Sequence, residues 1–143
     1  MRKIARYIYV GFAWLTLVAV IIPFFIAGMS LFVSRTYWSA HGEIGFSSGF
    51  PILGLIIFGL IGWIPRRLTA WLIGMTLLHF VHTALPSVQE AAPMIAAVHP
   101  VSALLLVSVT YVHARRATQL LLQPSQEAES TEVQVSAEPS TQI

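Results

Sequence analysis

Four long apolar stretches determine what this chain can fold into. They cover about residues 8–33, 41–64, 68–85 and 93–113, and short segments rich in polar residues, Pro and Gly separate them. A helix needs about 20 mostly apolar residues to cross the roughly 30 Å hydrocarbon layer of a bilayer. The sequence therefore predicts an all-α, integral membrane four-helix up-down bundle, because short second and third connections favour antiparallel neighbours.

The composition agrees that lipid surrounds this chain. Only 10% of its 143 residues are charged, whereas a soluble domain carries about 25%. A secretory signal peptide is the alternative for the first stretch, since Arg2, Lys3 and Arg6 precede it and Ala27 and Gly28 are small. The apolar part of a signal peptide has only about 7–15 residues, so we expect a retained span. The absence of cysteine excludes disulfides and thiolate-bound metal clusters.

The basic residues predict the orientation of the spans. If both termini are cytoplasmic, only Arg35 lies outside, and the other seven basic residues lie inside: Arg2, Lys3, Arg6, Arg66, Arg67, Arg115 and Arg116. Loops on the cytoplasmic side are enriched in Lys and Arg. Aromatic residues are expected at the two interfaces, with Tyr7, Tyr9, Trp63 and Trp71 near the inner one and Tyr37 and Trp38 near the outer one.

The last part of the chain differs from the rest. Residues 117–143 contain four Glu and no Lys or Arg, and Ser, Thr, Gln and Pro are frequent there. Such a segment buries too little apolar surface to offset its ordering entropy. We predict a transmembrane domain over residues 1–116 and a polar, acidic, disordered cytoplasmic tail over 117–143.

Four of the five histidines are predicted to lie in the outer half of the bundle: His41, His79, His82 and His99. At 1.5 Å per residue, His82 and His99 stand roughly 22 and 24 Å above the inner arginines of their spans. His79 lies roughly 4.5 Å deeper than His82, on the same helical face. On a straight helix, His41 would lie roughly 37 Å above Arg66. Only a bend or a shortening of the second span, permitted by residues 45–51, would bring His41 level with the others.

A polar face also runs along the fourth span. His99, Ser102, Thr110 and His113 fall within about 80° of one another on a helix. Polar side chains in a bilayer turn toward other helices, where they can hydrogen-bond across the interface. We expect this face to be buried in the bundle.

Three interpretations of the histidines remain open. They are interhelical hydrogen-bonding groups without a ligand, or axial ligands of a b-type haem, or a cluster that binds a divalent metal. Haem needs two imidazoles from facing helices at equal depth, and Arg35 is available for a propionate. The metal interpretation lacks a suitable carboxylate, because Glu43 and Glu90 are both expected to be exposed.

Four motifs resemble a family of small, uncharacterised bacterial four-span proteins, domain-of-unknown-function family 6220. They are Phe24-Phe25-Ile26-Ala27-Gly28, Ala40-His41-Gly42-Glu43-Ile44-Gly45, Pro65-Arg66-Arg67 and His99-Pro100-Val101-Ser102-Ala103-Leu104. The resemblance covers roughly residues 8–116 and implies a four-helix membrane fold, with one histidine before the second span and one in the fourth. It implies no established activity, and Ser102 stands where the family tends to have Asn.

The histidine pattern is also similar to one four-helix half of haem A synthase. That similarity implies His41 and His99 as an axial pair, whereas the count of depths favours His82 and His99. We expect a small multi-pass protein of the bacterial cytoplasmic membrane, an accessory or interaction subunit without catalysis. Its partners would be the lipid bilayer and another membrane complex or a second copy, with no nucleic acid. The alternative is a haem b electron-transfer protein that uses His41, His82, His99 or His79.

Overall fold

The computed structural model describes residues 1–122, and most of the predicted tail lies outside them. The described part contains helices and no strand, which confirms the all-α prediction. In chain order the helices are α1 (Arg2–Phe32), α2 (Tyr37–Ser47), α3 (Phe50–Gly62), α4 (Arg66–Ala84), the 3-10 helix η1 (Leu85–Val88), α5 (Pro93–Ala96) and α6 (His99–Leu122).

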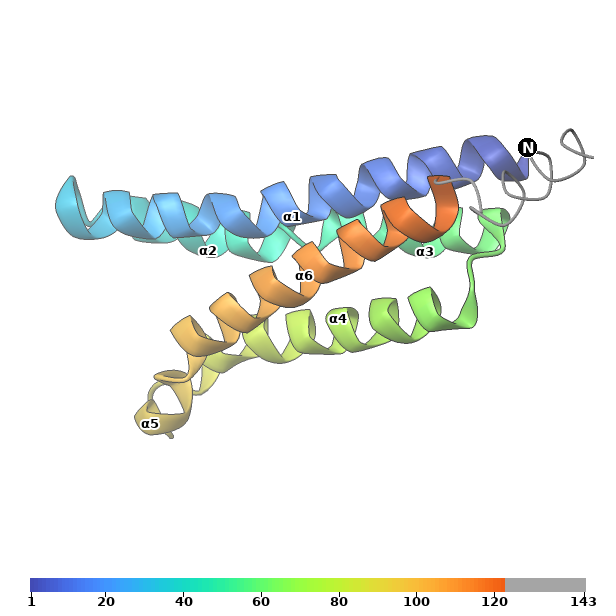
Figure 1. The fold of residues 1–143 in the computed structure, drawn as a ribbon. Coiled ribbons are helices and arrows are strands. Elements are labelled where there is room, and N and C mark those ends of the chain that lie inside the picture. Colours follow the sequence, from blue (N-terminus) through green and yellow to red (C-terminus); the bar gives the residue numbers. More distant parts are fainter. Residues whose placement is uncertain (123–143) are drawn as a thin grey trace, which may run out of the picture.

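Four helical segments are long and apolar enough to cross a membrane: Arg2–Phe32, Tyr37–Gly62, Arg66–Val88 and Pro93–Leu122. The protein is therefore a multi-pass membrane protein. The last helix continues to Leu122, past the predicted domain boundary at residue 116. Because the number of spans is even, the start of α1 and the end of α6 lie at the same end of the bundle (Figure 1), called here the terminal end. The opposite end, with His41, His82 and His99, is called the histidine end.

The bundle is built around α1. Helices α2 and α3 pack along one side of α1, α6 crosses it obliquely, and α4 packs against α6 (Figure 1). In contrast, α3 and α4 contact each other little, although they are consecutive in the chain. The up-down bundle is therefore open on the side between α3 and α4.

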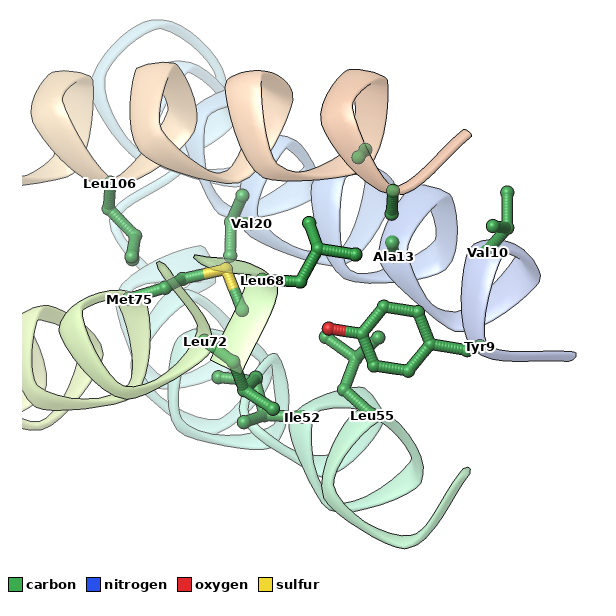
Figure 2. Close-up of a cluster of buried hydrophobic side chains, with 12 residues drawn as sticks. Tyr9, Val10, Ala13, Val20, Ile52, Leu55, Leu68, Leu72, Met75 and Leu106 are labelled. Carbon is green, nitrogen blue, oxygen red and sulfur yellow. The ribbon is translucent and has the colours of Figure 1, made fainter. Parts of the chain in front are cut away.

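The core lies in the half of the bundle nearer the terminal end. Figure 2 shows the Tyr9 ring of α1 entering a cluster that contains Leu55 of α3 and Leu68 and Met75 of α4, all of them fully buried. Most of the other large apolar side chains are exposed on the outside of the helices, as expected when lipid tails surround them.

The second span is interrupted where a bend was predicted. Helix α2 ends at Ser47, and α3 begins at Phe50 with Pro51 in its first turn. Proline has no N–H to donate to the carbonyl four residues before it, so the helical hydrogen bonds are interrupted there. The Ser48 hydroxyl donates to the carbonyl of Gly45 at 2.6 Å and supports the end of α2.

The polar face of α6 is buried, as predicted. Ser102, Thr110 and His113 all lie inside the bundle. His113 Nε2 and the Tyr9 hydroxyl form a hydrogen bond of 2.9 Å, and both side chains are fully buried. Tyr9, which was predicted near the inner boundary, turns its ring into the core to reach His113.

Replacing Tyr9 by phenylalanine should destabilise the bundle by about 1–2 kcal/mol, because His113 Nε2 would remain buried without a hydrogen-bond partner. Unfolding in a series of detergent mixtures would measure the loss. Tyr7→Phe is the matched control, since Tyr7 is exposed. Equal stabilities of the two variants would contradict a structural role for the Tyr9–His113 hydrogen bond.

Candidate functional site

Three of the four candidate histidines meet at the histidine end, each from a different helix. His82 of α4 and His99 of α6 stack with ring centroids 4.1 Å apart and planes at 14°. His41 of α2 approaches His99 with centroids 6.3 Å apart and planes at 81°. His99 is thus the ring that both other imidazoles contact.

The position of His41 differs from the count along a straight helix. That count assumes parallel helices, but α6 crosses α1 obliquely (Figure 1), and the second span is interrupted at Ser48 and Gly49. His41 therefore lies beside His99 rather than beyond it. The count was right that His82 and His99 lie at equal depth, because their rings stack.

Hydrogen bonds hold all three rings through the same nitrogen. His41 Nδ1 donates to the carbonyl of Pro23 at 2.9 Å, and His99 Nδ1 donates to the carbonyl of His82 at 3.1 Å. A carbonyl only accepts, so Nδ1 carries the proton in both rings. The Ser102 hydroxyl donates to the carbonyl of His99 at 2.8 Å, so its oxygen accepts from His82 Nδ1 at 2.9 Å. Each neutral ring therefore keeps an unprotonated Nε2.

This arrangement suits metal ligation. A histidine ligand usually donates its second ring N–H to a carbonyl or carboxylate, which fixes the tautomer and the ring orientation. In the described part of the chain, no hydrogen bond occupies Nε2 of His41, His82 or His99. Their free lone pairs are thus available to a ligand.

Two adjoining cavities surround these rings. One has a volume of about 280 Å³ and reaches the apolar side chains of Val20 and Leu106, and the other has about 880 Å³ and extends to Pro86 of η1. Both are lined by His41, His82 and His99, together with Trp38 and Pro23. Volumes of roughly 300–1,000 Å³ are typical of pockets that hold small molecules and cofactors.

The distances between rings distinguish the possible ligand pairs. An imidazole nitrogen binds a transition metal at roughly 2 Å and lies roughly 1 Å from its ring centroid, so two ligands on opposite sides of one iron have centroids roughly 6 Å apart. His41 and His99, at 6.3 Å, match this spacing. His82 and His99, stacked at 4.1 Å, are too close to bind on opposite sides of one iron.

His79 does not line the cavities that the other three rings share. It is buried, and its Nε2 would be 2.7 Å from a Cβ placed on Gly49. Both Glu43 and Glu90 are exposed. Among residues 1–122, no group of three or more His or acidic side chains is arranged to hold a metal ion.

The sequence did not reveal the anchoring groups of this site. The carbonyls of Pro23 and His82 come from the backbone, which carries no residue-type signal. Ser102 was identified as part of the polar face of α6, yet not as the partner of His82. Trp38 was placed at the interface, and its ring also contacts His41, with centroids 5.4 Å apart.

Comparisons with known proteins give a match to a family model. No curated protein and no solved structure matches the chain. Residues 23–88 match a family of unknown function (DUF6220). The matched part contains His41, His79 and His82, and it ends before His99. The predicted resemblance is therefore confirmed: over residues 23–88 this chain is similar to the DUF6220 family.

Proposed function

We propose that this membrane protein binds a b-type haem between His41 and His99 and transfers single electrons. The observation that supports this function best is the 6.3 Å separation of the two ring centroids, because it matches two imidazoles on one iron. Both Nδ1 atoms donate to backbone carbonyls, which leaves the two Nε2 atoms for the metal. The haem would supply the one-electron chemistry, and the protein would hold its iron and exclude water.

The surroundings of the pair favour electron transfer over catalysis. Two histidine ligands leave no open position on the iron for oxygen or a substrate. The cavities reach Val20 and Leu106, which would pack against the porphyrin and lower the local polarity. Arg35, in the turn between α1 and α2 at the histidine end, is exposed and available to a propionate.

The proposed location is the bacterial cytoplasmic membrane, with the histidine end facing outward. Arg2, Arg66, Arg67 and Arg116 belong to the terminal end, and cytoplasmic ends of spans are enriched in such residues. The haem would then lie nearer the outer surface. Fusion of a reporter that is active only in the cytoplasm, joined after residue 143, would test this orientation.

The absorption spectrum of protein purified from haem-supplemented cells tests the function. We expect a six-coordinate b-type spectrum in the oxidised and dithionite-reduced states, with about one haem per chain. A colourless protein from such cells would overturn the proposal. The accessory role predicted from the sequence would then remain. That role predicts that gentle extraction recovers this chain together with another membrane complex.

A further inference from the structure

Another cavity lies between α3 and α4, away from the histidines. Its volume is about 600 Å³, and its walls are almost entirely apolar. Leu60 and Trp63 line it on the α3 side, and Ile73 and Leu77 line it on the α4 side. All four side chains are more than half exposed, so the cavity opens toward the lipid that surrounds the helices.

The cavity exists because α3 uses its small residues against α1. A Cβ on Gly59 would lie 3.2 Å from the Tyr9 ring, and a Cβ on Gly62 would lie 3.4 Å from the Arg6 side chain. These glycines let α3 approach α1 closely, while α4 packs against α6. The space between α3 and α4 is therefore left without a protein side chain to fill it.

Basic side chains surround the end of the cavity at the terminal end. Arg66 and Arg67 are exposed in the first turn of α4, directly after the connection from α3. The guanidinium of Arg2 lies 5.3 Å from the centroid of the Trp63 ring, and Arg6 Nε donates to the carbonyl of Gly62 at 3.0 Å. The two acidic residues among residues 1–122, Glu43 and Glu90, belong to α2 and to the loop before α5, at the histidine end.

Trp63 has an unusual backbone at the same place. Its φ of 49° and ψ of 61° lie in the left-handed region, and residues with this conformation at helix C-termini are usually glycine. Retention of a bulky residue in this unfavourable conformation is typical of a position with a functional constraint. Here it places an amphipathic indole on the wall of the cavity, beside the arginines, at a depth that tryptophan prefers.

We infer that this cavity binds one acyl chain of an anionic phospholipid, whose phosphate contacts Arg66 and Arg67. The apolar walls suit a hydrocarbon chain, and the arginines complement a negative headgroup where no carboxylate of the described residues competes. Guanidinium groups bind phosphate oxygens through two parallel hydrogen bonds. The inference is independent of the proposed haem site, which lies between other helices.

Native mass spectrometry of the full chain, released from nanodiscs of phosphatidylglycerol and phosphatidylcholine, tests this inference. We expect one phosphatidylglycerol to be retained with a preference of about thirtyfold, the effect of two basic residues near a membrane surface. Arg66→Gln with Arg67→Gln should reduce the preference to near unity. Arg115→Gln with Arg116→Gln removes the same charge from another part of the terminal end and should preserve it.

A second pair of variants tests the cavity itself. Ile73→Trp fills it and should abolish retention of either lipid, whereas Leu104→Trp places the same bulk on an exposed position of α6 and should not. Equal retention of the two lipids by the wild type, or a preference unchanged by Arg66→Gln with Arg67→Gln, would overturn the inference. A dimer of the wild type that Ile73→Trp disrupts would also overturn the inference, because a second copy of this chain would then occupy the cavity in place of a lipid.

Discussion

Alanine in place of His41 or His99 is expected to abolish the six-coordinate haem spectrum, while alanine in place of His82 should leave it six-coordinate. The reason is the spacing of the rings, because the centroids of His41 and His99 are 6.3 Å apart, whereas those of His82 and His99 are too close at 4.1 Å. His99 keeps its anchor in His82→Ala, since it donates to the backbone carbonyl of residue 82. Absorption and resonance Raman spectra of the purified variants would measure the coordination.

His79→Ala serves as the control for this series. His79 is buried but lines neither cavity, so its loss should leave the spectrum six-coordinate. A spectrum lost in His82→Ala and retained in His41→Ala would show that His82 and His99 are the ligands. The stacked arrangement would then have to open when haem binds.

Gly54→Ala is expected to destabilise the bundle by about 1–3 kcal/mol, as overpacking does in a well-filled core. A Cβ on Gly54 would overlap the ring of Phe12, which stacks on Phe58 with centroids 5.6 Å apart. The Phe12 ring therefore cannot move aside without losing this contact. Thermal unfolding in detergent, followed by circular dichroism, would measure the decrease in stability.

Gly74→Ala is the matched control, because nothing lies within 4 Å of a Cβ at that position. Alanine has the higher helix propensity, so this variant should be as stable as the wild type or up to about 1 kcal/mol more stable. Phe12→Leu combined with Gly54→Ala should recover part of the loss. If Gly54→Ala and Gly74→Ala behaved alike, close packing of α1 against α3 would be contradicted.

Much of the fold could be predicted from the sequence, because a bilayer leaves few choices. Apolar stretches of sufficient length must be helical there, since no water is present to bond an open backbone. The apolar runs therefore predicted the four spans, and Pro51 with its neighbouring glycines indicated where the second span is interrupted. The position of Tyr9 could not be predicted, because an aromatic ring near a helix end suits both the interface and the core.

The sequence also identified the histidines that are candidate ligands, since polar side chains inside a membrane are rare and face other helices. It could not decide between His41 and His82 as the partner of His99. Axial counting gives a height along each helix separately, but the distance between two rings depends on how the helices cross. The oblique crossing of α6 over α1 and the interruption at Ser48 and Gly49 determine that distance. Residue types thus determined the spans and the candidate ligands, whereas interhelical packing alone determined the separation of the His41 and His99 rings and the open cavity between α3 and α4.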